Sequence, residues 1–395
     1  MSKWQRIIFI LCLGITLKIN AQDQTLKKLT LDGYISNMQS IIDMDSLNGY
    51  WLYESQLHNR LNLNYYPTSS LNFSVQVRNR FVFGDRIRMD INDVNKKAYN
   101  SDLGIMDLSF NLADGRSYIL NTSIDRVWLK YTLKKMEVTV GRQRINWGQT
   151  FVWNANDWFN NYSFFDVDYI ERPGSDAVRV QYYTSAVSGA EAVVKLDSSK
   201  KITAAALYKL NSGKYDFQLL GGILSGEDLA LGFGWSGGLG SIGFRGEMSY
   251  FHRLNQLPDT SGLFFLSLAF DYTFDNSLMI QVEGFYNQMP KSYHGKSFME
   301  FYQRPLSVKD LSFTEFNFFG QVSYPFTPLL SGSLATLLFP KIRGYYIGPA
   351  FTYSLADNLE FSIFVQLFSG RFPDTTGDPE RQTFTLGFMR FKYNF

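Results

Sequence analysis

The feature that most constrains this fold is an alternation of apolar and polar residues along almost the whole chain. In the segment NLEFSIFVQLFS, Leu359, Phe361 and Ile363 fall on one face, and Glu360 and Ser362 fall on the other. The same period of two recurs in FFLSLAFDYTF, LMIQVEGFYNQ, LNFSVQVRNRF and DRVWLKYTL. Such a period is typical of β-strands whose two faces meet different surroundings. We therefore expect an all-β protein.

The apolar residues are abundant but dispersed. Aromatic residues make up 17% of the chain, with 35 Phe and 24 Tyr, yet the mean hydropathy is −0.15. After residue 22, no apolar run reaches the ~18 residues that a membrane helix needs. Only helices and closed barrels satisfy every backbone group in lipid, and barrels alternate lipid-facing with lumen-facing residues. We expect a transmembrane antiparallel β-barrel. A secreted β-sandwich or propeller is the less favoured alternative, because no blade-length repeat is present.

The first 22 residues, MSKWQRIIFILCLGITLKINAQ, have the pattern of a secretory signal peptide. Lys3 and Arg6 precede a short apolar run, and a small residue, Ala21, precedes the expected cleavage site. The one cysteine, Cys12, lies in this run, so the mature chain 23–395 forms no disulfide. Without the three basic residues of the leader, 35 of the 38 basic residues remain beside 36 acidic ones. This near-neutral balance argues against nucleic acid as a partner.

Short and long connections alternate along the chain. Turn signals stand at YPTSS (66–70), KK (134–135), GG (237–238) and two DN pairs, whereas longer segments separate other strands. Tight turns at one rim and long loops at the other are typical of outer-membrane barrels. Counting strands back from the C-terminus gives about 18, with 16 as the alternative if two Ala-rich or short strands merge. The long outer loops are expected at 84–122 and 290–312, within one barrel domain, 23–395.

The chain ends on a strand pattern, GFMRFKYNF. It resembles the C-terminal signal that assembly machinery recognises in outer-membrane proteins, carried here by Phe391, Tyr393 and Phe395. The resemblance implies two partners, the barrel-assembly machinery during biogenesis and the lipid of a Gram-negative outer membrane.

The densest segment, residues 140–183, departs from the strand pattern. It gathers Trp147, Trp153 and Trp158 among Asn, Asp and Arg residues. So much aromatic surface has to pack somewhere, and the interleaved polar residues argue against lipid. We expect residues of about 143–175 to fold into the barrel as a lumen loop that constricts or plugs it.

This segment carries a family resemblance. GRQRINWG, then NANDWFN, then ERPGSDAVRV resemble the hallmark of porin-like outer-membrane barrels of Bacteroidota, and more distantly the alginate-export and substrate-specific porin barrels. The resemblance covers about 44 residues. It implies that the equivalent loop lies in the lumen.

Two sets of candidate residues follow. The candidate constriction residues could form salt bridges that anchor the loop, for example between Arg142 and Asp157, or could line the solute path; they are Arg142, Arg144, Trp147, Trp153, Asp157, Asp166, Glu171 and Arg172. The inward charges of the strands could set up a transverse field or simply pair across a wet interior; they are Arg60, Arg78, Arg80, Arg126, Lys130, Arg179, Glu247, Asp271 and Glu283.

The sequence does not predict an enzyme. The three histidines, His58, His252 and His294, have no metal-ligand spacing, and no nucleophile-elbow motif is present. We expect no metal and no cofactor. Two functions remain: a channel for small polar solutes constricted by the inward loop, or a plugged barrel that serves as a scaffold subunit of an outer-membrane assembly or secretion complex, with a protein partner at its outer loops.

Overall fold

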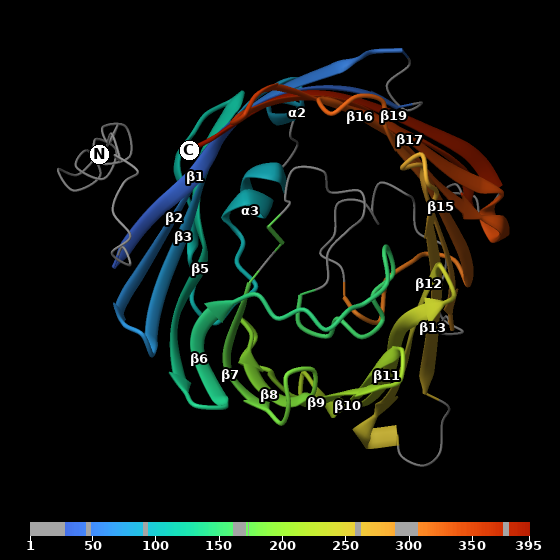
Figure 1. The fold of residues 1–395 in the computed structure, drawn as a ribbon. Coiled ribbons are helices and arrows are strands. Elements are labelled where there is room, and N and C mark those ends of the chain that lie inside the picture. Colours follow the sequence, from blue (N-terminus) through green and yellow to red (C-terminus); the bar gives the residue numbers. More distant parts are fainter. Residues whose placement is uncertain are drawn as a thin grey trace.

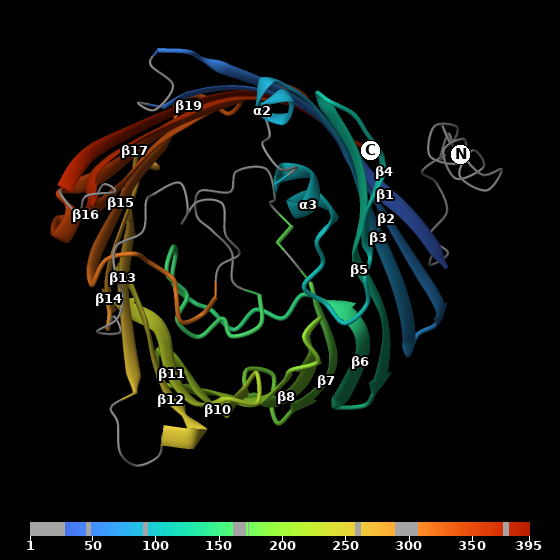
Figure 2. The ribbon, with the colours of Figure 1, turned by 180° about the vertical axis from the view of Figure 1, so that it is seen from behind.

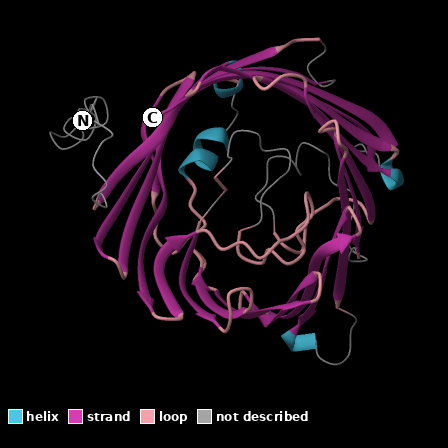
Figure 3. Cartoon of the chain, viewed as in Figure 1, coloured by secondary structure: helices cyan, strands magenta, loops and turns pink. Residues whose placement is uncertain are grey.

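The computed structural model describes residues 28–44, 49–89, 94–160, 171–172, 174–256, 262–288, 307–373 and 379–395. The expected signal peptide and most of the expected outer loop 290–312 lie outside these residues. In the described part, one antiparallel sheet closes on itself into a barrel (Figures 1, 2 and 3). The wall contains 18 strands, as the sequence predicts, and one short strand, β4, pairs only with β5.

The strands follow one another around the wall in chain order, each paired with the next except that β3 pairs with β5. The first half comprises β1 (Leu29–Met44), β2 (Leu52–Thr68), β3 (Leu71–Gly84), β4 (Ser109–Asp114), β5 (Tyr118–Leu133), β6 (Met136–Gln143), β7 (Ser175–Tyr183), β8 (Gly189–Leu196), β9 (Ile202–Ser212) and β10 (Tyr215–Leu224). The second half comprises β11 (Asp228–Leu239), β12 (Ile242–Arg253), β13 (Leu263–Thr273), β14 (Met279–Asn287), β15 (Phe316–Pro325), β16 (Leu330–Phe339), β17 (Gly344–Ala356), β18 (Leu359–Pro373) and β19 (Pro379–Asn394).

The two terminal strands close the barrel. β1 pairs antiparallel with β19 from Tyr34 opposite Asn394 to Met44 opposite Phe384. The backbone of Phe395 then exchanges two hydrogen bonds of 3.0 Å with Gly33. Phe391, Tyr393 and Phe395 remain exposed on the outer face. Since closure removes the last open edges of the sheet, the C-terminal strand completes the wall.

The alternation seen in the sequence becomes the two faces of the wall. Outward-facing apolar residues such as Leu129, Tyr131 and Leu133 are 45–48% exposed. The inward-facing residues that alternate with them along the strands are polar or are packed in the interior. The turns at 134–135, 275–277 and 357–358 stand where they were predicted. The GG turn is wrong, because β11 continues through Gly237 and Gly238 and the chain turns at Gly240, which has a φ of +66°.

The wall is built in two tiers between β5 and β9. Strands β6, β7 and β8 have only 8, 9 and 8 residues, against 17 in β2 and 16 in β5. Beyond their ends, β4 pairs with the first residues of β5, 119–123, whereas β6 pairs with residues 127–133. A segment of residues 101–108, here called the strap, runs along the ends of the short strands. Leu103 and Ile105 of the strap are exposed. Short strands and strap together therefore form this part of the wall.

The few helices are short. The segment expected as an outer loop, 84–122, contains α2 (Asp85–Arg88), α3 (Val94–Asn100), β4 and the start of β5. Two single 3-10 turns, η3 (Leu254–Gln256) and η4 (Pro340–Ile342), follow β12 and β16. No helix in the described ranges is long and apolar enough to cross a membrane.

Candidate functional site: the lumen loop and its cavity

The connection from β6 to β7 runs inside the barrel. β6 ends at Gln143 and β7 begins at Ser175, and we call the chain between them the lumen loop, 144–174. Its described part after β6 lies in the interior in both end-on views (Figures 1 and 2). Its described residues are 144–160, 171–172 and 174. Most of 152–160 is buried against the inner wall, so this stretch is part of the packed structure and lies away from the outer rim.

Two buried carboxylates of the wall hold the backbone of the loop. Glu247 on β12 accepts hydrogen bonds from the backbone N–H groups of Gln149, Thr150 and Asn156. Glu283 on β14 accepts from three further backbone N–H groups, those of residues 151, 152 and 153, at 2.8–2.9 Å. Successive N–H groups that converge on an anion form a nest, and hydrogen bonds to charged acceptors are stronger than neutral ones. The two carboxylates therefore fix the loop without an ion pair to Lys or Arg among the described residues.

The hydroxyl and indole groups around these carboxylates complete the attachment. Ser267 donates to Glu283 at 2.8 Å. Ser249 donates to the carbonyl oxygen of Ala155 at 2.8 Å and accepts a hydrogen bond from the indole N–H of Trp158 at 3.2 Å. The loop is thus bound through backbone and side chain to the same stretch of wall, β12 to β14.

The aromatic residues of the loop fill the space between it and the wall. Trp153 stacks on Phe285 of β14, with ring centroids 5.5 Å apart and planes 8° apart. Trp147 packs edge-on against Phe159 at 4.8 Å, and its indole N–H donates to Glu191 at 2.7 Å. Buried tryptophans normally find such a partner for their N–H. The expected packing of the aromatic surface is met on the inner wall.

A second inward segment extends this apolar core. Val308, Leu311 and Phe313 precede β15 and are 5–7% exposed. Phe313 lies with its ring centroid 4.7 Å from that of Phe339 and 5.8 Å from that of Phe372. One continuous apolar cluster therefore runs along the inner faces of β8 to β18, covered by the lumen loop and by residues 307–314.

The opposite inner wall is polar and basic. Asp125 lies at a β-bulge of β5, where the pairing register with β3 shifts, so Asp125 and Arg126 both reach the interior. Its carboxylate accepts from Arg60 on β2 at 2.6 Å and from Arg78 on β3 at 3.0 Å. All three side chains are at most 6% exposed. We call these three residues the arginine cluster.

The end of the lumen loop meets the arginine cluster. Glu171 lies with its carboxylate 3.9 Å from the guanidinium of Arg60, and its carbonyl oxygen accepts a hydrogen bond from Arg126. Further along, Arg80 donates to Asn121 at 3.2 Å and lies over the ring of Tyr99. The described parts of the loop therefore contact two sides of the interior, residues 149–156 at β12 and β14 and Glu171 at the basic wall.

Arg142 has different partners from those predicted. It lies on β6, where its guanidinium binds Asp176 on β7 at 2.6 Å and Asp102 of the strap at 2.5 Å, and it also donates to the carbonyl oxygen of Met106. These contacts hold the strap to the ends of the short strands. The partners that the structure describes for Arg142 are therefore Asp176 and Asp102 and not Asp157 or Glu171, because the strap brings Asp102 to it from 40 residues away.

Asp157 is the buried carboxyl within the loop itself. It is 1% exposed, and this burial raises its pKa to about 6. The backbone N–H groups of Asn160 and Trp147 and the positive charges of Arg172 and Arg144 act on the pKa in the opposite direction. Burial outweighs them because transfer of a carboxylate out of water is costly. Asp166 lies outside the described residues.

The other predicted charges pair locally or lie beneath the loop. Arg179 binds Glu191 at 2.7 Å, Arg245 binds Asp271 at 2.5 Å and Lys130 lies 3.4 Å from Glu137. Glu247 and Glu283, expected as lumen-lining charges, face the interior but are 0% and 2% exposed under the loop. In the described ranges, no group of three or more His, Cys, Asp or Glu residues could hold a metal ion.

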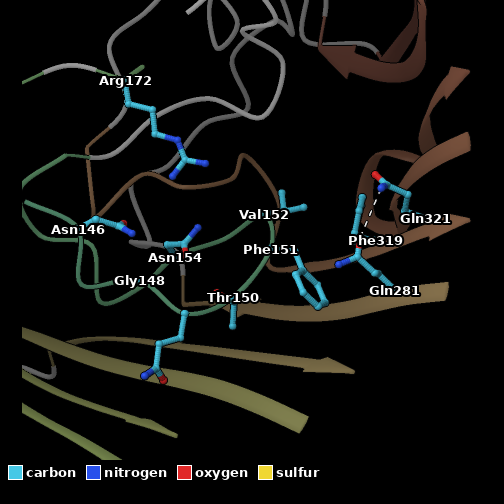
Figure 4. A pocket seen from close by; sticks show the side chains of 11 residues that line it. Asn146, Gly148, Thr150, Phe151, Val152, Asn154, Arg172, Gln281, Phe319 and Gln321 are labelled. Carbon is cyan, nitrogen blue, oxygen red and sulfur yellow. Dashed lines mark hydrogen bonds between the residues drawn. The ribbon is translucent and has the colours of Figure 1, made fainter. Parts of the chain in front are cut away.

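A cavity of about 340 Å³ lies between the loop and the wall strands β14 and β15 (Figure 4). Figure 4 shows Arg172 entering it from one side and the amides of Gln281 and Gln321 on another. Arg172 has a φ of +62°, in the left-handed region. The lining residues are mainly amides, two phenylalanines and one arginine: Asn146, Gly148, Gln149, Thr150, Phe151, Val152, Asn154, Arg172, Gln281, Phe319 and Gln321.

Sequence reasoning missed most of this lining. Gln281 and Gln321 alternate inward like other polar strand residues, so the strand pattern placed them on the inner face but gave no reason to single them out. Asp125 was missed because a bulge interrupts the period of two at that point. Both became visible only where the loop and neighbouring strands meet them.

Solved barrels share this architecture. The outer membrane protein OprD of Pseudomonas aeruginosa aligns with a TM-score of 0.56 at 11% identity, over 93% of this chain and 94% of that one. OpdQ of the same organism aligns with 0.56 at 9% identity, over 94% and 99%. OccAB4 of Acinetobacter baumannii aligns with 0.55 at 9% identity, over 95% and 100%. What they share is the fold. The sequence matches no protein-family model and no curated protein.

Proposed function

We propose that this protein is an outer-membrane channel for small polar solutes, constricted by the lumen loop. The wall offers an outward apolar surface to lipid, and its strands satisfy their backbone groups by closing on themselves. OprD, with the same fold, is an outer membrane protein by its name. In this setting the exposed Phe391, Tyr393 and Phe395 serve the assembly machinery as the recognised strand end.

The observation that carries the proposal is the position of the lumen loop. Six backbone N–H groups bound to Glu247 and Glu283 keep it against one half of the wall. The arginine cluster and the polar inner faces of β2, β3 and β5 lie on the other side. A fixed loop beside a polar wall sets both the width and the charge of the passage between them.

Single-channel current across a planar bilayer tests this function. The purified protein should give discrete openings, and its reversal potential under a salt gradient reports whether anions or cations pass more easily. Replacing residues 146–158 by a short Gly-Ser linker should raise the conductance. A protein that inserts but never opens, with or without those residues, would contradict a channel.

The alternative function is a plugged scaffold barrel. The observation in its favour is the apolar core between loop and wall, where Trp147, Trp153 and Trp158 are all at most 6% exposed. Purification in a mild detergent separates the two functions. A stoichiometric protein partner favours the scaffold, whereas conductance of the partner-free barrel favours the channel.

A further inference from the structure

The cavity beside the lumen loop differs in chemistry from the basic wall across the interior. Among the described residues, its lining contains five amide side chains, Asn146, Gln149, Asn154, Gln281 and Gln321, and no carboxylate. Its volume, about 340 Å³, lies at the lower end of the ~300–1,000 Å³ typical of small-molecule sites. The space is therefore suited in size to a small solute, and its lining defines which kind.

The two glutamines form a pair with defined free groups. Gln321 donates one N–H to the side-chain oxygen of Gln281 at 3.4 Å and the other to Ser323 at 3.1 Å (Figure 4 shows the first). This leaves the side-chain oxygen of Gln321 as an acceptor and the amide N–H groups of Gln281 as donors. The pair thus presents a donor and an acceptor side by side from two neighbouring strands.

The remaining lining narrows the class of solute. Phe151 belongs to the lumen loop and Phe319 to β15, so the amides lie among aromatic rings. The single cation, Arg172, already interacts electrostatically with the buried Asp157. A charged solute would lose hydration here with little compensation, because the described lining offers a cation no carboxylate and offers an anion one arginine that is shared with Asp157. A hydroxyl group both donates and accepts, as the glutamine pair requires.

We propose that this cavity is a subsite for neutral polyhydroxylated solutes, of the size of a simple sugar, on the path through the barrel. This inference rests on the channel function proposed above and names its solute class. Gln281 and Gln321 select by hydrogen bonding to hydroxyl groups, and Phe151 and Phe319 contact the apolar faces of the sugar ring.

Swelling of proteoliposomes tests the inference with three solutes of similar size: glucose, gluconate and glucosamine. In the unchanged protein, glucose should enter faster than either charged relative. The double variant Q281M/Q321M keeps side-chain length but loses the amides. It should slow glucose roughly three- to tenfold, the loss expected from one or two hydrogen bonds, and leave KCl conductance nearly unchanged. The matched control is Q181M, which removes an inward amide of β7 away from the cavity.

The outcomes separate the two proposals. A barrel without any ion conductance overturns the channel function itself. A conducting barrel that admits gluconate or glucosamine faster than glucose overturns only the sugar subsite. A double variant that slows all three solutes in proportion also overturns the sugar subsite, because its effect is then on pore width. A double variant that leaves glucose entry unchanged overturns the subsite as well.

Discussion

The two halves of the inner wall handle buried charge in different ways. On β2, β3 and β5, the charges of Arg60, Arg78 and Asp125 meet one another as side chains. On β12 and β14, Glu247 and Glu283 meet no cation among the described residues and accept hydrogen bonds from six backbone N–H groups of the lumen loop. The closest ion pairs of the first arrangement join wall strands, with Glu171 of the loop 3.9 Å from Arg60, whereas the second arrangement exists only when the loop is in place. Charge on the second wall therefore serves to position the loop.

The largest effect is expected from removing both loop anchors. The double variant E247L/E283L leaves six loop N–H groups without acceptors, at about 1–3 kcal/mol each if they stay buried. The loop can relieve this cost by leaving the wall, so we expect it to detach more readily while the wall stays closed. Conductance should rise severalfold, and limited proteolysis should cut within residues 149–156.

The matched control for that variant is E360L. Glu360 is also a wall carboxylate, but its contact, Arg390 at 3.5 Å, lies on the neighbouring strand β19. This variant should leave the loop protected from protease. Equal cleavage of the two variants would mean that the anchors do not hold the loop.

The second prediction concerns the arginine cluster, whose ion pairs join the wall strands β2, β3 and β5. Asp125→Asn leaves Arg60 and Arg78 buried without their shared counter-charge, which should cost about 3–5 kcal/mol of unfolding free energy. Urea unfolding in detergent measures the loss. Because the cluster does not hold the loop to β12 or β14, protection of residues 149–156 from protease should persist. Loop release in D125N would show that the two halves are coupled.

The third prediction uses pH to test the loop alone. The pKa of Asp157 is raised to about 6 in the folded protein, against an ordinary value of 3.8. Folding then binds this proton more tightly, so stability is greatest at pH values below 3.8 and falls as pH rises towards 6. The difference corresponds to roughly 3 kcal/mol. Asp157→Asn should stabilise the protein at pH 7.5, have little effect near pH 4, and so flatten the pH dependence. Equal effects at both pH values would contradict a raised pKa.

The smallest effect on stability is expected at a partly exposed ion pair on the basic side of the wall. Lys130 and Glu137 lie 3.4 Å apart, with side chains 33% and 21% exposed. Such pairs contribute about 0–1 kcal/mol. Glu137→Gln should therefore change the urea midpoint only slightly, in contrast to D125N. A loss of unfolding free energy as large as that of D125N would mean that burial does not determine how much these ion pairs stabilise the protein.

The inward loop and the strand count could be predicted because both leave local marks. The strand count also included the short or Ala-rich strands β8 and β9. The Trp and Phe residues of the loop had to be covered, which placed the loop inside. The partners were not predictable. Arg142 finds Asp102 on the strap, and Trp147 finds Glu191 on β8, through contacts that alternation does not encode.

The sequence by itself determined that the chain is a barrel of about 18 strands with an aromatic loop in its interior. It could do so because neighbouring residues of a strand point to opposite faces, so their alternation shows what each face contacts. Only the tertiary structure decided what the inner charges do. The N–H groups of the loop reach Glu247 and Glu283 across 91 to 132 residues of sequence. A carboxylate that pairs with backbone has no partner side chain to mark it, so folding alone reveals which glutamates anchor the loop.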